Sequence, residues 1–64
     1  MIIKEDKYCI VSKSFPLKFM KDGEEWDTIY DIYLEDKKAC EDELNTYDEP
    51  EEFQILNVKV TYEF

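Results

Sequence analysis

The most regular pattern in the chain lies between residues 53 and 62, and it is the pattern of a β-strand. Apolar side chains alternate with polar ones at Leu56, Val58, Val60 and Tyr62. Such alternation is typical of a strand with one buried face. Phe53 and Ile55 have the opposite parity, which predicts either a bulge or a strand that begins only near Leu56. A strand of this kind needs neighbouring strands and a layer that packs on its apolar face, so the remaining residues have to supply both.

Two further strands are predicted upstream. The uninterrupted apolar run 8–11 favours a central strand over residues 7–14, which ends before Pro16 because proline cannot donate to a ladder. Asp22-Gly23 is the strongest turn signal, because a tight hairpin turn needs residues that accept positive φ angles. A second strand is expected from Trp26 to Leu34, with alternate residues on opposite faces.

Residues 36–47 show helical periodicity. Asp36 is suited to the N-cap position, where its carboxylate can accept a hydrogen bond from the first free amide groups. Cys40, Leu44 and Tyr47 fall on one stripe, which we expect to pack on the sheet. Because the residue before a proline disfavours the helical region, Pro50 predicts that the helix stops before it.

These elements predict one α+β domain over residues 1–64, with the order β-β-α-β. We expect a three-stranded antiparallel sheet in the order 2-1-3, with one helix packed on one face. A right-handed crossover through the helix would leave the second and third strands parallel in direction. A chain of 64 residues buries only about 60% of the surface that its unfolded form exposes, so the core is expected to be thin.

The charge of the chain is strongly negative and unevenly distributed. The net charge is −9; residues 1–21 hold five lysines and two acids, whereas residues 22–64 hold fifteen acids and three lysines. Binding to nucleic acid needs cations that displace phosphate counterions, so direct nucleic-acid binding is not expected. An anionic membrane surface would repel the chain as well. The charge favours a basic partner, whose approach it would accelerate.

Catalytic and metal-binding patterns are not visible in the sequence. The chain has no histidine, so neither a Ser-His nor a Cys-His nucleophile pair can form. The oxygen-rich stretch 22–27 lacks the ligand spacing of an EF-hand loop, and two cysteines are too few for a zinc site without histidine. We therefore expect no enzyme activity, no cofactor and no dedicated metal.

The sequence also predicts a compartment. No apolar stretch approaches the roughly 18 residues of a membrane span, and charged residues follow Met1 closely, so we expect a cytoplasmic protein. In a reducing cytoplasm, Cys9 and Cys40 are expected to be free thiols that act as small buried hydrophobes.

The candidate partner-binding residues are nine acids near aromatic residues, together with the tryptophan that one group of them surrounds. They are Glu24, Glu25, Trp26, Asp27, Glu41, Asp42, Asp48, Glu49, Glu51 and Glu52. Dense carboxylates with few cations among them can imitate the phosphates of duplex DNA, which carries one charge per ~1.7 Å. Trp26 is either a binding anchor among these acids or part of the core. The alternatives are that the acids form a solvated face, or that the protein is a structural subunit that associates with itself through the sheet.

The length, the charge and the β-β-α-β pattern resemble those of small acidic phage-encoded host-takeover and anti-defence inhibitors. The resemblance includes the segment 36–44 and Phe53-Gln-Ile. It implies a DNA-mimic-like inhibitor that binds a basic or DNA-handling host protein in the host cytoplasm. The net positive first third departs from the pattern of a complete DNA mimic.

Overall fold

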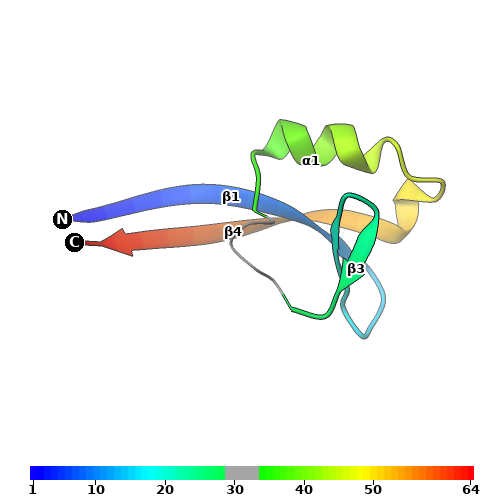
Figure 1. Cartoon of the computed structure of the whole chain (residues 1–64), viewed down its shortest axis with the longest axis horizontal. Helices are drawn as coiled ribbons and strands as arrows, with labels where there is room; N and C mark the ends of the chain where they lie inside the picture. The colour runs from blue at the N-terminus through cyan, green and yellow to red at the C-terminus, as the bar shows by residue number, and fades with distance from the viewer. Residues whose placement is uncertain (29–33) are drawn as a thin grey trace.

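The structure is a computed structural model that describes residues 1–28 and 34–64, and over these residues it combines an antiparallel sheet with one α-helix (Figure 1). The elements are β1 (Ile2–Ser12), β2 (Phe19–Lys21), β3 (Glu24–Trp26), α1 (Lys37–Leu44), the short 3-10 helix η2 (Pro50–Glu52) and β4 (Phe53–Glu63). The α+β class is therefore confirmed.

The sheet of the described residues has four strands in the order β3-β2-β1-β4, not the three that the sequence predicts. All three pairings are antiparallel. The additional strand arises because the chain re-enters the sheet after Pro16, so that Ile10 pairs with Met20 and Val11 with Phe19. The Asp22-Gly23 turn then joins β2 to β3. Its φ angles of 53° and 81° are the positive values that a two-residue hairpin turn requires.

The predicted second strand, 26–34, is only partly present in its described residues. Trp26 is the last residue of β3, and neither 27–28 nor Leu34 belongs to a strand. The remainder of that prediction, 29–33, lies outside the described residues. The sheet is extended instead by an isolated bridge, in which the amides of Tyr8 and Glu35 each donate to the other's carbonyl oxygen at 2.8 Å.

The directions of the described strands follow from these pairings. Because β1 is antiparallel to both β2 and β4, those two strands run the same way, and β3 runs opposite to them. The bridge of Glu35 to Tyr8 is also antiparallel, so the chain just before the helix runs in the same direction as β4 at that point.

Strands β1 and β4 pair along their whole lengths, in one register from Ile2 opposite Glu63 to Ser12 opposite Phe53. The register is unbroken, so the predicted bulge is absent from β4 and the strand starts at Phe53. The change of parity has another cause. Phe53 and Ile55 face the helix, and the apolar residues beyond them lie on the opposite face of the sheet.

The helix packs on the sheet as predicted but is shorter. The Asp36 carboxylate accepts a hydrogen bond from the amide of Ala39 at 2.7 Å, which confirms the N-cap. The helix ends at Leu44 rather than Tyr47. The core joins Ile10, Met20 and Cys40, and partly buried apolar side chains pack against it, namely Tyr8, Leu44, Tyr47, Phe53 and Ile55.

The outer halves of β1 and β4 extend beyond the helix as a two-stranded ribbon, which we call the arm (residues 1–7 and 58–64; Figure 1). The arm accounts for the elongated shape, with principal extents of 43, 24 and 16 Å. At its tip the two ends of the chain lie side by side, because Met1 and Phe64 exchange main-chain hydrogen bonds of 2.8 and 2.9 Å.

Candidate partner-binding site

An open hollow of about 490 Å³ lies where the end of the helix meets the β2–β3 hairpin turn. Its base is formed by the buried Met20 and the half-buried Tyr47 and Phe53. Exposed carboxylates border it, from Asp48, Glu49 and Glu52. We call these six residues the acidic pocket.

The connection after the helix shapes this pocket. The amide of Tyr47 donates to the carbonyl of Leu44 at 3.1 Å, which turns the chain back across the end of the helix. The 3-10 helix that follows closes with a bond of 3.1 Å from the amide of Glu52 to the carbonyl of Glu49. The amide of Lys13 then donates to the Glu52 carbonyl at 3.0 Å, which fixes the acidic turn against the end of β1.

Tyr47 is the aromatic centre of the pocket. Its ring meets that of Phe53 edge to face, with centroids 5.2 Å apart and an interplanar angle of 73°. Its hydroxyl donates to Oε2 of Glu43 at 2.5 Å. Burial, and then the Glu43 carboxylate, raise the pKa of Tyr47, so the phenol stays protonated and its ring stays uncharged.

The carboxylates at the border repel one another. The charge of Glu49 is the main cause that raises the pKa of Glu52, and Glu51 adds to the effect. A cation that entered the pocket would relieve this repulsion. The aromatic rings beneath it would favour a cation as well, because the face of a ring carries partial negative charge.

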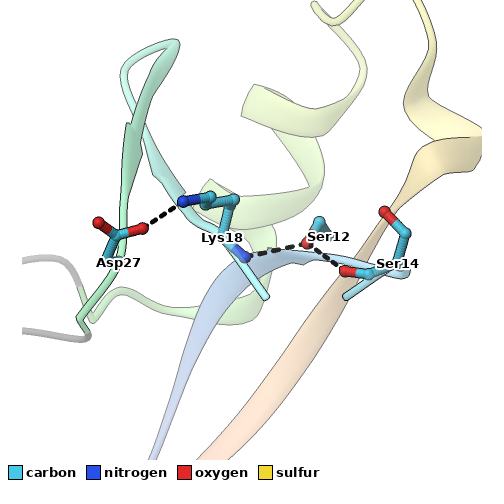
Figure 2. A network of polar contacts seen from close by, with 4 residues as sticks. All are labelled: Ser12, Ser14, Lys18 and Asp27. Atoms are coloured by element: carbon cyan, nitrogen blue, oxygen red, sulfur yellow. Dashed lines mark hydrogen bonds and ion pairs between the residues drawn. The ribbon is translucent and has the colours of Figure 1, made fainter. Parts of the chain in front are cut away.

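A second, smaller hollow of about 200 Å³ adjoins the first, since Glu52 lines both. It is also lined by Glu25 from the hairpin and by Phe15, a residue that is 86% exposed. A polar network supports the loop that carries Phe15 (Figure 2). In it, Ser12 Oγ accepts from the amide of Lys18 at 3.0 Å and donates to the Ser14 carbonyl at 3.1 Å.

The structure brings only part of the predicted partner-binding set together. Asp48, Glu49 and Glu52 border the pocket, and Glu25 joins them through the second hollow. The remaining six predicted residues line neither hollow; they are Glu24, Trp26, Asp27, Glu41, Asp42 and Glu51. All of them except Trp26 are exposed.

Two of these predicted residues already have cationic neighbours. Asp27 pairs with Lys18 (Figure 2), and Asp42 lies 3.6 Å from Lys38 one helical turn away. Trp26 is half-buried at the end of β3, so it is less exposed than the Phe15 side chain.

The methionine and the aromatic residues of the two hollows were not among the predicted site residues; they are Met20, Tyr47, Phe53 and Phe15. One sequence signal could have indicated two of them, because Tyr47 and Phe53 bracket the acidic run 48–52. An aromatic at each end of a short acidic turn can place rings beneath its carboxylates.

The described residues contain no group of three or more Cys, Asp or Glu arranged to hold a metal ion. Both Cys9 and Cys40 are free and buried, as predicted. Within the same part of the chain, no helix is long and apolar enough to cross a membrane. No protein-family model, curated protein or solved structure matches the chain.

Proposed function

We propose that the protein binds a basic site on a host protein, of the kind that holds nucleic-acid phosphate, and blocks that site by occupying it. The acidic pocket is the centre of this contact. It receives a lysine or arginine side chain of the partner, whose charge meets the carboxylates while its aliphatic stem packs on the rings. The exposed acids around it attract the partner from a distance.

The observation that supports this proposal best is the combination of Tyr47 and Phe53 with three exposed carboxylates in one hollow. A merely solvated acidic face needs no apolar base. Binding hot spots are typically aromatic groups or charges at the centre of a patch, surrounded by contacts that exclude water. The exposed Phe15, close to Glu25 and Glu52, extends such a patch.

Two variants with equal changes of net charge test the role of the pocket. The first changes the carboxylates of the border, as Asp48→Asn, Glu49→Gln and Glu52→Gln. The second changes acids that line neither hollow, as Glu24→Gln, Glu41→Gln and Asp42→Asn. Each protein is immobilised and used to capture partners from host lysate at low salt, with elution by increasing salt. A captured protein is then tested for loss of DNA or RNA binding when the inhibitor is added.

We expect the pocket variant to bind the captured protein about tenfold or more weakly, because it loses charges next to the partner's cation. The control variant should lose only the part of the affinity that comes from long-range attraction, and this loss should appear chiefly in the association rate. Equal loss in both variants would mean that a diffuse charge, and not the pocket, holds the partner. Unchanged nucleic-acid binding by the captured protein would contradict the blocking role.

The pocket itself can be probed with a small ligand. Titration of the protein with the tripeptide Gly-Arg-Gly should shift the NMR signals of the Met20 methyl group and of the Tyr47 and Phe53 rings. The same peptide with citrulline in place of arginine has nearly the same shape without the charge, and it should leave these signals in place. Shifts of equal size with both peptides would remove the electrostatic basis of the proposal.

A further inference from the structure

The outer edge of β4 presents a row of main-chain groups that no strand of the described residues pairs with. Their direction follows from the main-chain hydrogen bonds of β1. Tyr8 bonds to Glu35 on one side of β1, and Met1 bonds to Phe64 on the other side. Because main-chain groups alternate between the two sides of a strand, the odd-numbered residues of β1 bond to β4. The odd-numbered residues of β4 therefore direct their amide and carbonyl groups outward.

The arm is incomplete as a structural unit. A two-stranded ribbon is marginally stable in water unless a third strand or a packed layer supports it. Residues 2–6 and 61–64 are all exposed. Ile3 and Tyr62 pair with each other, and 40% and 42% of their residue surface remains accessible although both are largely apolar. An exposed edge of this length is a template for another strand.

The arm is also electrically neutral, unlike the molecule as a whole. Residues 1–7 and 58–64 hold three lysines and three acids, so the whole net charge of −9 lies in the remaining residues. Two copies of so acidic a protein repel each other at most orientations. The repulsion is weak where neither surface carries a net charge, as at the arm.

We propose that two copies of this chain associate through their arms, by antiparallel pairing of β4 with β4 across a two-fold axis at Thr61. This interface lies apart from the acidic pocket and does not depend on the proposed function. The pairing creates a four-stranded ribbon from two arms, in which both outward rows of main-chain groups find partners.

The side chains select this register. Lys59 and Glu63 are the two charged residues of β4, and both have outward-directed main-chain groups. A two-fold axis at Thr61 places Lys59 opposite Glu63 of the second copy, twice in the dimer. On the other face it places Val60 opposite Tyr62, a β-branched and aromatic pair of the kind that stabilises sheets. An axis at Lys59 would instead set two lysines against each other.

The corresponding edge of β1 fits a second copy less well. The bridge to Glu35 interrupts it at Tyr8. The part that remains carries four consecutive charged residues, from Lys4 to Lys7. Charged side chains on an edge strand oppose pairing with another chain, so β4 is the edge that accepts the second copy.

The register predicts a specific pattern of charge variants. Lys59→Glu and Glu63→Lys each place like charges opposite each other at both contacts, so each variant alone should dimerise about tenfold more weakly. A mixture of the two variants restores opposite charges at both contacts and should form a mixed dimer. Lys38→Glu and Glu51→Lys are matched controls outside the arm and should dimerise as the wild type does.

Sedimentation velocity over a wide concentration range measures how far each protein dimerises. Circular dichroism verifies that every variant is folded. A dimer in the wild type, loss in both single variants and recovery in the mixture support the proposal. Three results would overturn it: a wild type that stays monomeric up to its solubility limit, dimers that persist in both single variants, or a mixture that stays monomeric.

Discussion

The two cysteines are the chemically most reactive side chains of the core, and the fold keeps them unreactive. Cys40 faces the sheet from the helix and is 2% exposed, as is Cys9 on β1. Burial, together with nearby Cys9 and Glu43, raises the pKa of Cys40 to about 11. A thiolate is the reactive form of cysteine, so this thiol is inert at neutral pH. It serves as a small apolar residue that fills the contact between helix and sheet.

The raised pKa of Cys40 predicts a loss of stability in alkali. The unfolded thiol ionises near pH 9.0 and the folded one near pH 11, so the folded state holds its proton longer. The contribution of the Cys40 thiol to the free energy of unfolding is therefore fully present below pH 9, and it is lost as the pH rises to about 11. The free energy of unfolding should decrease there by at most about 1.4 kcal/mol per pH unit for this one proton.

Urea denaturation under reducing conditions, repeated between neutral and alkaline pH, measures this slope. Cys40→Ala removes the thiol and should flatten the slope, although its small cavity costs about 1 kcal/mol at neutral pH. If the variant keeps the wild-type slope above pH 9, other groups such as Tyr47 carry the alkaline dependence.

At the scale of elements, the helix depends on its cap and on packing rather than on its own sequence. It has only eight residues and begins with Lys37 and Lys38, whose charges oppose the helix dipole. The Asp36 carboxylate compensates for this order, because it satisfies the amide of Ala39 and places a negative charge at the N-terminus. Cys40 and Leu44 then hold the helix against the sheet.

Removing the cap should therefore destabilise the whole domain. We expect Asp36→Ala to lower the free energy of unfolding by about 1 kcal/mol, because an orphan amide and an unopposed dipole remain. Asp36→Ser keeps a capping oxygen and should recover most of the loss. Urea denaturation at neutral pH compares the three proteins. A loss of similar size in the serine variant would assign the effect to charge rather than to capping.

The elements that the sequence predicts well are those whose pattern is local. The alternation in β4, the apolar run 8–11, the Asp22-Gly23 turn and the Asp36 cap each depend on neighbouring residues, and all of them are present. Strand β2 is different. Its three residues are too few to show alternation, and Met20 becomes a core residue only because it pairs with Ile10. Such pairing depends on residues distant in sequence.

The acidic pocket likewise combines a part that a local pattern predicts with a part that depends on residues distant in sequence. The acids that border it are visible as a charged run, but its base joins Met20 of the hairpin to Tyr47 and Phe53 from beyond the helix. No short-range pattern links these three. The first strand, predicted over 7–14, instead spans Ile2–Ser12 for a related reason: residues 2–6 form a strand by pairing with the end of β4 and not by a hydrophobic pattern of their own.

On the scale of the whole molecule, charge is separated into a neutral arm and an acidic body. Two lysines of the net positive first third are neutralised by acids from the later part of the chain: Lys18 pairs with Asp27, and Lys21 pairs with Glu35. The body therefore presents a predominantly negative surface around a thin core, and repulsion within it opposes folding.

Salt should accordingly stabilise the fold. Raising NaCl from about 20 mM to about 300 mM shortens the Debye length from about 20 Å to about 6 Å, which screens this repulsion. We expect the melting temperature to rise by about 5 °C, which corresponds to roughly 1 kcal/mol for a domain of this size. Binding of a basic partner should respond in the opposite direction.

Thermal unfolding followed by circular dichroism at several salt concentrations measures the effect, with KCl as a check against specific ion binding. The Glu24→Gln, Glu41→Gln, Asp42→Asn variant carries less charge on the body and should respond less to salt. A melting temperature that falls with salt would mean that the exposed ion pairs outweigh the repulsion.

The pairing of β1 with β4 also determines how the chain can fold. A ribosome delivers β1 before the hairpin and the helix, and β4 after them, so β1 has to remain without its principal partner through most of synthesis. The long segment between β1 and β4 has to bring the two strands together before most of the sheet contacts can form. This requirement makes folding slow for so short a chain. Until that closure, the apolar run 8–11 is open to chaperones and to neighbouring nascent chains.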